Sequence, residues 1–223
     1  MIRPELESLR RDYEGRGASA SASAADAPSL SDEVASYVSG FASLKASFPN
    51  LRMAVNSPTI VDAALSRGDD GLFDKALAAS LLEKVDGVHF KETQLLSAPG
   101  SALGLCRERG LDVSLSTHSM HSYRRCEEVL EGEGLRPSFA LAGTCYLTGS
   151  HPEKDERDCR GLELVADLAD AGCDVVAIGG ITPERLGEVV NRGADGVAIL
   201  SGWMEDNGEW GEALTRHMET HPT

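Results

Sequence analysis

Two segments near the end of the chain carry residue types that bind phosphate groups through the backbone. Gly179 and Gly180 precede Ile181-Thr182-Pro183, and Leu200 and Ser201 precede a further glycine, each directly after an apolar, β-branched run. Glycine has no side chain, so its N–H group can approach an anion, and the helix that follows adds its positive dipole end. The pattern predicts a phosphate site formed by these four residues. A simple tight turn at the two glycines is the alternative.

Three titratable residues lie at or near the expected strand ends and could transfer a proton near neutral pH. They are His118, His151 and Cys145. An unperturbed imidazole titrates close to neutrality, which is typical of general acid/base catalysts. Cys145 is a candidate acid/base at the same rim, with a buried and inert cysteine as the alternative. A further histidine, His89, lies within a strand pattern and is interpreted as a packed, hydrogen-bonded core residue.

A repeated pattern predicts the strands that must position these residues. Glycine or a charged residue is followed by aspartate and then by a short apolar run, which is typical of a helix end and a buried strand. Strands are expected at residues 51–56, 86–90, 111–116, 138–143, 174–179 and 195–200. Apolar residues at helical spacing predict helices from residue 31 to Pro49, around Leu162, Val165 and Leu168, and around Leu186, Val189 and Val190.

The alternation of strands and helices predicts a parallel α/β fold, a (β/α)8 barrel of the TIM type whose first strand-helix units are weak or missing. We expect residues 31–223 to form this barrel domain. Residues 1–30 contain an Ala/Ser/Gly-rich run that buries too little apolar area to order itself, so a poorly ordered segment is predicted. Residues 63–80 are expected to be a surface insertion. A missing first strand would leave an unpaired edge, which favours association into a homo-oligomer.

The composition restricts the partners that the chain can bind. Its 36 acidic and 21 basic side chains among 223 residues give a formal charge of −15, which repels nucleic-acid and anionic lipid phosphates. We therefore expect a small phosphate ligand, held locally, and neither nucleic acid nor a membrane. The first residues lack the apolar segment of a secretory signal, so a cytoplasmic location is predicted, with an organelle left open. The five widely spaced cysteines are expected to be reduced thiols.

Several of these segments together resemble one known family. The matching segments are Val85 to His89, Ser116 to Ser119, Gly143 to His151, Val176 to Pro183 and Gly193 to Ala198. They look like the thiamine-phosphate synthase and thiazole tautomerase superfamily, over roughly residues 85–205 and more weakly over residues 30–60. The resemblance implies a barrel that holds a thiazole phosphate after its last strands. The synthase joins that thiazole to a pyrimidine whose diphosphate leaves with Mg²⁺ assistance, whereas the tautomerase moves a proton on a thiazole carboxylate phosphate.

The resemblance also implies roles for individual positions. The thiazole phosphate would be bound at the four residues of the predicted phosphate site. Thr148 and Ser150 match two threonines of the synthase, and Ser116 matches a serine that faces the diphosphate.

Other positions depart from the family pattern. The two metal-binding aspartates align with Ser57 and Gln94, the diphosphate lysine aligns with His151, and the tautomerase histidine aligns with Thr144. Glu92 is the nearby carboxylate that could replace a metal ligand. Because Mg²⁺ prefers carboxylate oxygens, a Mg²⁺ ion is expected only if the chain is synthase-like, and otherwise no cofactor.

Three functions remain open at this point. The first is a transferase like thiamine-phosphate synthase, or an isomerase like the tautomerase. The replaced residues suggest an alternative, a catalytically inactive relative that binds a phosphorylated metabolite as a sensor or interaction subunit. The third is a phosphosugar isomerase or epimerase of similar architecture, because the same phosphate loops serve those enzymes, although no metal-ligand set or lysine-based site is visible in the sequence.

Overall fold

The computed structural model describes residues 39–40, 42–43, 45–47, 50, 52–56, 80, 82–97, 100–148, 155, 159–199 and 209–220. The predicted segment 1–30 and nearly all of the predicted insertion at 63–80 lie outside these residues. The chain divides into two compact units. The first comprises residues 1–90, 97–113 and 133–135, and the second comprises residues 91–96, 114–132 and 136–223.

Six strands are described, and each corresponds to a strand that the sequence predicts. They are β1 (Ala54–Val55), β2 (Gly87–Lys91), β3 (Asp112–Thr117), β4 (Pro137–Ala142), β5 (Val175–Ile178) and β6 (Gly196–Ala198). Hydrogen bonds join them in the order β1-β2-β3-β4-β5-β6. The pairs β1–β2, β4–β5 and β5–β6 are parallel. A parallel α/β fold with strands in sequential order is therefore confirmed, whereas the complete eight-stranded barrel stays a prediction.

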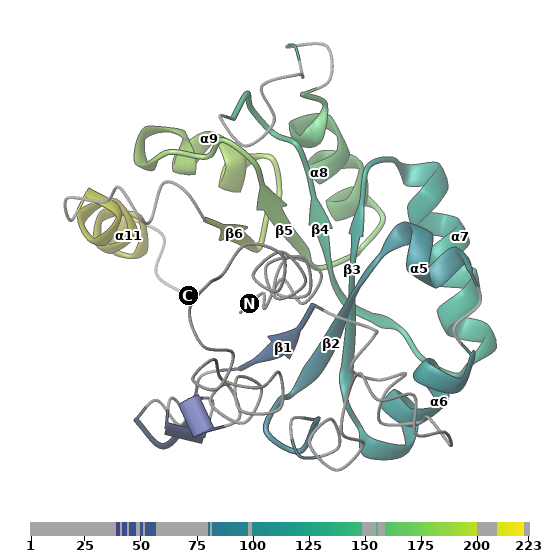
Figure 1. Cartoon of the computed structure of the whole chain (residues 1–223). Helices are drawn as coiled ribbons and strands as arrows, with labels where there is room; N and C mark the ends of the chain where they lie inside the picture. Colours follow the sequence, from purple (N-terminus) through teal and green to yellow (C-terminus); the bar gives the residue numbers. More distant parts are fainter. Residues whose placement is uncertain are drawn as a thin grey trace, which may run out of the picture. The chain divides into compact units, whose positions relative to one another are not determined.

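The helices follow the strands in the expected alternation (Figure 1). They are α5 (Glu92–Leu96), α6 (Gly100–Arg109), α7 (Met120–Gly132), α8 (Gly161–Asp170), the 3₁₀ turn η2 (Pro183–Arg185), α9 (Leu186–Asn191) and α11 (Glu209–Thr220). The two predicted apolar stripes lie in α8 and α9, where Val165, Leu168 and Val189 are fully buried. Of the helix predicted before Pro49, residues 39–40, 42–43 and 45–47 are described, and they are helical.

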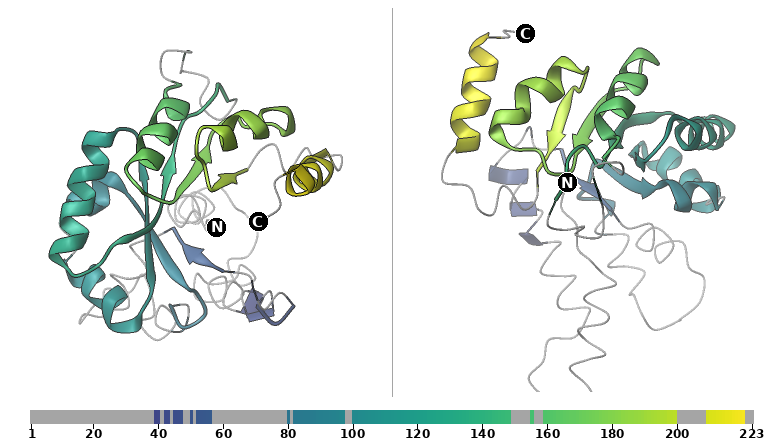
Figure 2. Two further views of the ribbon diagram at one scale, coloured as in Figure 1. Left: turned by 180° about the vertical axis from the view of Figure 1, so that it is seen from behind. Right: turned by 90° about the horizontal axis from the view of Figure 1, so that it is seen from above.

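Within the second unit, the helices pack closely on the strands and on each other. Helix α8 packs on β4 and β5, α9 packs on β6 and η2, and α7 packs on α5 and α8. The carboxy-terminal helix α11, drawn in yellow, lies beside η2 and α9 (Figures 1 and 2). Its Trp210 is buried, as are the strand residues Leu115, Val175 and Ala177.

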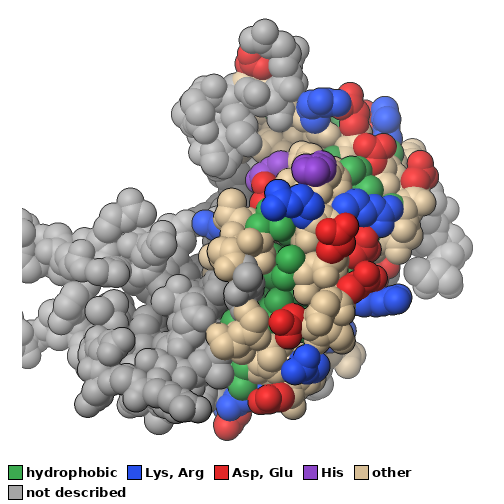
Figure 3. Space-filling model, turned by 90° about the vertical axis from the view of Figure 1, so that its right-hand side faces the viewer, with side chains coloured by type: hydrophobic (Ala, Val, Ile, Leu, Met, Phe, Trp, Pro, Cys, Tyr) green, Lys and Arg blue, Asp and Glu red, His purple; other side chains and the backbone are tan. Residues whose placement is uncertain are grey.

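In the first unit, β1, β2 and α6 each contribute buried side chains. They include Val55, Val88, Phe90, Leu103 and Cys106, each at most 1% exposed. The thiols of all five cysteines are free, as the sequence predicts. Among the described helices, none combines the length and apolar character that a bilayer crossing requires. The face of the molecule in Figure 3 carries acidic and basic side chains interspersed with one another.

Two aspartates of the repeated pattern, Asp86 and Asp195, form hydrogen bonds at the amino-terminal ends of strands. Asp86 Oδ2 accepts a hydrogen bond from the Met53 N–H (2.8 Å), and Asp195 Oδ2 accepts one from the Val175 N–H (2.8 Å). Each carboxylate thus provides a hydrogen-bond acceptor for a backbone N–H at the start of the preceding strand, where the regular hydrogen bonding between strands begins. Lys45 also forms an ion pair with Asp86 at 2.6 Å. Burial opposes ionisation of Asp86, but the Lys45 ammonium and the Met53 N–H outweigh it and lower the pKa of this carboxyl group.

Candidate functional site

The segments that follow β2, β3, β4 and β5 contact one another at one rim of the second unit. After β2, the Glu92 carboxylate accepts hydrogen bonds from the Thr117 hydroxyl (3.4 Å) and the His118 N–H (3.3 Å) at the end of β3. The His118 ring in turn bonds the Gly143 carbonyl oxygen at the end of β4. A Cβ on Gly143 would lie 2.6 Å from the Ile178 side chain at the end of β5. These contacts define the rim. Residues that are far apart in the sequence, from Glu92 to Ile178, thus form a continuous series of contacts at this rim.

The His118 side chain is exposed at this rim, and its hydrogen bond selects one tautomer. Nδ1 lies 3.0 Å from the Gly143 carbonyl oxygen, which can only accept. The proton of the neutral ring is therefore on Nδ1, and Nε2 carries a lone pair that can accept a proton. This is the arrangement that a general base needs.

Gly179 and Gly180 form the turn after β5, and both have backbone conformations that favour glycine. Their φ angles are 102° and 60°. A Cβ on Gly179 would lie 2.8 Å from the Thr144 side chain, and one on Gly180 would overlap the carbonyl oxygen of Leu147. The turn is thus packed tightly against the segment 144–148 that follows β4. Thr148, a predicted ligand residue, directly follows Leu147 in this segment and is half-buried.

Backbone hydrogen bonds join the same two segments. The Cys145 N–H donates to the Ile178 carbonyl oxygen and the Tyr146 N–H donates to the Gly179 carbonyl oxygen, both at 3.0 Å. The Gly161 N–H at the start of α8 donates to the Thr144 carbonyl oxygen at 2.9 Å. The glycine turn is therefore held on one side by the backbone of the neighbouring loop.

Two side chains that no sequence motif marks, Arg185 and Tyr146, complete this arrangement. Arg185 donates a hydrogen bond to the Gly180 carbonyl oxygen (2.8 Å), and its guanidinium lies 4.2 Å from the centre of the Tyr146 ring. The Tyr146 hydroxyl donates to Glu188 (2.8 Å). Burial and the Glu188 carboxylate raise the pKa of Tyr146 to about 12, so the phenol remains a donor. The residues meet across 39 positions of sequence, a separation at which no spacing rule applies.

The helix start beyond the turn already holds a carboxylate. Glu184 accepts a hydrogen bond from the Thr182 hydroxyl (2.6 Å). That bond and the Glu184 N–H lower the pKa of the Glu184 carboxyl group. The positive end of the helix, which the sequence pattern predicts to bind the phosphate, thus also interacts with the Glu184 carboxylate. The glycine turn is the better-placed source of N–H donors.

Cys145 has the environment of a packed thiol. Its side chain is 2% exposed, and Sγ lies 3.6 Å from the Ala142 carbonyl oxygen. Burial raises the pKa of the Cys145 thiol to about 11, so it stays protonated at neutral pH. The structure therefore favours the inert-cysteine alternative over an acid/base role. His89 is fully buried and has an interaction partner, as its core interpretation expects.

The remaining predicted site residues divide into two groups. Ser116 lies in β3, is half-buried and has an interaction partner. Ser150, His151, Leu200 and Ser201 lie outside the described residues.

With this geometry defined, comparison with known proteins identifies the family. The family model described as thiamine monophosphate synthase matches residues 73–203, which is more than half of the chain. The chain belongs to the thiamine monophosphate synthase family. The matched region includes the described rim and the glycine turn.

Relatives within this family are moderately similar to the chain. The thiamine-phosphate synthase of Bacillus licheniformis is 28% identical over 155 residues, covering 63% of this chain and 66% of the relative. That of Haloquadratum walsbyi is 32% identical over 127 residues, covering 56% and 52%. The chain thus spans between half and two thirds of the length of these relatives.

Solved structures confirm the fold. A thiamine phosphate pyrophosphorylase from Pyrococcus furiosus superposes with a TM-score of 0.56 at 20% identity, covering 86% of this chain and 80% of that one. The 3-hexulose-6-phosphate synthase of Salmonella typhimurium superposes with a TM-score of 0.55 at 14% identity, covering 82% and 81%. At these identities the likeness establishes a TIM-type parallel α/β fold and nothing finer.

The described residues do not by themselves fit the Mg²⁺ ion that the family resemblance implies. Mg²⁺ binds through several oxygen ligands, and no group of three or more acidic, histidine or cysteine residues that could hold a metal occurs in the described part of the chain. Glu92 Oε2 is engaged by Thr117 and His118. Gln94, which stands where the family has a metal aspartate, accepts a hydrogen bond from the Lys91 N–H (2.7 Å) and so caps helix α5.

Proposed function

We propose that the rim binds a thiazole phosphate and that the chain acts on it as a transferase of the thiamine-phosphate synthase type. The glycine turn carries this proposal. Gly179 and Gly180 have positive φ angles and no side chain, so the turn can present N–H groups to a phosphate at close range. Membership of the thiamine monophosphate synthase family supports the choice of ligand.

Thr148 and Ser116 are proposed to contact the ligand from the neighbouring strand ends. Thr148 lies next to the residue whose carbonyl touches Gly180, and Ser116 lies two residues before His118 in the rim. Ser150, Leu200 and Ser201 belong to the same proposed site on sequence grounds alone, as does His151 as a second acid/base candidate. Glu92 stays a proposed metal ligand only for the synthase reaction.

A tautomerase-like reaction is the second candidate, and His118 favours it. Its Nε2 is free to accept a proton because Nδ1 donates to the Gly143 carbonyl oxygen. In a proton shift on a thiazole, Nε2 would remove a proton from one ring position, and the resulting imidazolium would return it to another. Charge and atoms balance without a co-reactant.

The net charge of the chain bears on its ligand and its location. We propose a cytoplasmic protein that acts on a small phosphate ester, because a net charge of −15 disfavours polyanionic partners. The complete barrel and its association into oligomers remain part of the proposal.

Calorimetric titration with hydroxyethylthiazole phosphate tests the proposed function. The wild-type protein should bind it at micromolar to millimolar concentration and more tightly than inorganic phosphate. A parallel titration with Mg²⁺ and a pyrimidine diphosphate present separates the candidates, because only a synthase should bind more tightly with both. Assays of thiamine phosphate formation and of thiazole isomerisation then identify the reaction. Binding without either turnover would support the inactive relative, and absence of binding would refute the proposal.

A further inference from the structure

Tyr146 makes three contacts with the segment from Gly179 to Glu188, which contains the glycine turn and the helix start after it. Its N–H donates to the Gly179 carbonyl oxygen (3.0 Å), its ring lies against the Arg185 guanidinium, and its hydroxyl donates to Glu188 (2.8 Å). The side chain is half-buried, so these contacts are partly shielded from water. Tyr146 therefore links the loop after β4 to both the turn and helix α9.

Arg185 holds the next carbonyl group of the same turn. Its guanidinium donates to the Gly180 oxygen at 2.8 Å while its face covers the Tyr146 ring at 4.2 Å. A planar guanidinium can do both at once, because the donors lie in its edge and the stacking surface is its face. The Tyr146 backbone N–H and the Arg185 side chain thus fix two successive carbonyl groups, those of Gly179 and Gly180, and the Tyr146 ring supports the Arg185 guanidinium.

Fixing a carbonyl group also fixes the N–H group of the following residue. In a trans peptide the C=O and N–H bonds lie in one plane and point in opposite directions. The Gly179 carbonyl faces Tyr146, so the Gly180 N–H points away from it. The Gly180 carbonyl faces Arg185, so the Ile181 N–H points away from that side chain. Without these anchors, two consecutive peptide units with positive φ at glycine could rotate into other conformations.

We infer that Tyr146 and Arg185 are positioning residues of the phosphate site, which hold two carbonyl groups and thereby direct the Gly180 and Ile181 N–H groups toward the phosphate. The inference rests on the proposed function, because it concerns the residues that orient the N–H groups of the proposed phosphate site. Arg185 acts here through the backbone. A direct contact between its charge and the phosphate is the competing explanation.

Double-mutant binding measurements separate these two explanations. Arg185→Met and Tyr146→Leu should each weaken hydroxyethylthiazole phosphate binding by about tenfold, the size expected for losing one charge-assisted hydrogen bond or its support. The double variant should bind about as weakly as either single variant, because both remove one unit. Tyr146→Phe keeps the ring that lies against Arg185, which Tyr146→Leu removes, and should stay within about threefold of wild type. If Arg185 contacted the phosphate directly, Tyr146→Leu would bind normally or the two losses would add.

Two controls distinguish positioning from a general loss of structure. Unphosphorylated hydroxyethylthiazole should bind all variants equally, because only the phosphate uses the oriented N–H groups, and thermal unfolding should show that each variant is folded. In amide NMR spectra recorded at one phosphate ester concentration near the wild-type Kd, the Gly180 and Ile181 signals should shift clearly in the wild type and much less in Arg185→Met. Equal loss for both ligands, or variants that bind the phosphate ester like the wild type, would overturn the inference. A wild type that binds no phosphate ester would instead refute the proposed function, and the inference with it.

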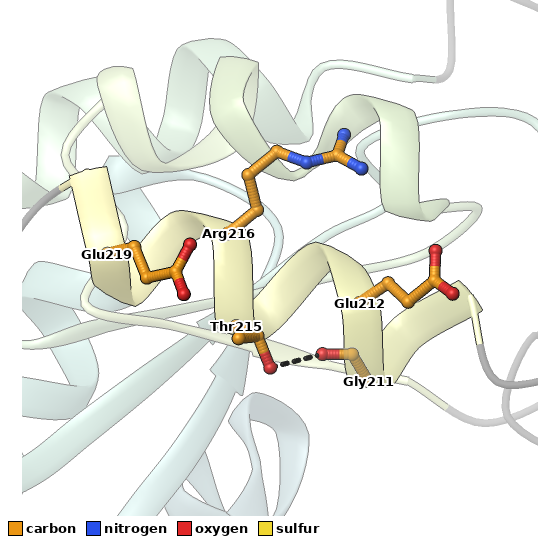
Figure 4. Close-up of a pocket in the computed structure, with 5 residues that line it drawn as sticks. All are labelled: Gly211, Glu212, Thr215, Arg216 and Glu219. Atoms are coloured by element: carbon orange, nitrogen blue, oxygen red, sulfur yellow. Dashed lines mark hydrogen bonds between the residues drawn. The ribbon is translucent and has the colours of Figure 1, made fainter.

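Helix α11 carries a shallow hollow, which we do not propose as a second binding site because its lining comes from this helix alone. It has a volume of about 510 Å³ and is lined by Gly211, Glu212, Thr215, Arg216 and Glu219, all from one helix (Figure 4). Its one drawn hydrogen bond, from the Thr215 hydroxyl to the Gly211 carbonyl oxygen (2.8 Å), is internal to the helix.

Discussion

The two ends of the strands use their polar groups in different ways. At the amino-terminal ends, the Asp86 and Asp195 carboxylates accept hydrogen bonds from the first N–H groups of neighbouring strands, which completes the backbone hydrogen bonding. At the carboxy-terminal ends, the glycine turn has positive φ angles and the His118 ring is exposed, and we propose that their backbone and ring atoms contact a ligand. In parallel barrels the first end contributes stability and the second carries function. Substitutions at the two ends should therefore separate stability from activity.

The largest effect is expected at His118. His118→Gln removes the proton-accepting Nε2, so turnover should fall by about 100-fold or more if the wild type performs the tautomerase-like proton shift. Substrate binding should change little, because the proposed phosphate site lies at the glycine turn. His121→Gln, three positions along in α7 and also exposed, is the matched control and should turn over normally. Steady-state kinetics check this, and unchanged turnover in His118→Gln would remove His118 from the chemistry.

The glycine turn should affect binding and stability together. An alanine at Gly180 would need a φ of 60° and would overlap the Leu147 carbonyl oxygen. Gly180→Ala should lose about 2 kcal/mol or more of unfolding free energy and bind thiazole phosphate at least about tenfold more weakly. In Gly187→Ala, the matched control in α9, the added Cβ meets nothing within 4 Å. Urea unfolding and calorimetry measure both effects, and a Gly180→Ala variant like Gly187→Ala would contradict the described turn.

At the amino-terminal ends of the strands, a substitution should lower the stability of the protein and leave its ligand binding unchanged. Asp195→Ala removes the acceptor of the Val175 N–H and should cost about 1 kcal/mol of unfolding free energy, with thiazole phosphate affinity unchanged. Asp174 precedes β5 in the same sequence pattern, but it contributes its backbone carbonyl oxygen, which accepts the Ala140 N–H, whereas Asp195 contributes its carboxylate. Asp174→Ala should therefore be nearly neutral. Weakened ligand binding in folded Asp195→Ala would break the distinction between the two ends.

The smallest effect concerns acid stability through Asp86. Its pKa is lowered in the folded protein, because Lys45 and the Met53 N–H outweigh the opposing effect of burial. Its contribution is therefore fully present above the unfolded pKa near 3.8 and is lost as the pH falls through the lower folded value. Lys45→Met should reduce the difference in unfolding free energy between pH 5 and pH 3. Denaturant titrations at both pH values test this, and an unchanged difference would assign the pKa shift to another cause.

Local patterns in the sequence predicted the elements well for a physical reason. Helix ends and buried strands leave short-range signals, and Asp174 followed by Val175 is one of them. The glycine turn was predicted in the same way, because two adjacent glycines after a strand permit only a few local structures.

Contacts across the fold left no such signal. Tyr146 contacts Arg185 because the strands that precede them, β4 and β5, are neighbours in the sheet. In the sequence, Tyr146 has the pattern of an ordinary loop residue and Arg185 that of an ordinary helix residue. The burial of Cys145 and the capping role of Gln94 depend on packing and on one hydrogen bond that the pattern does not encode. These are the features on which the assignment of chemistry depends most.

A crystal structure of the protein with bound hydroxyethylthiazole phosphate is the most direct measurement. The phosphate oxygens should lie within hydrogen-bond distance of the Gly180 and Ile181 N–H groups, with Tyr146 and Arg185 still holding the Gly179 and Gly180 carbonyl oxygens. A phosphate bound away from the glycine turn, or a turn whose carbonyl groups have left these anchors, would contradict the proposed site.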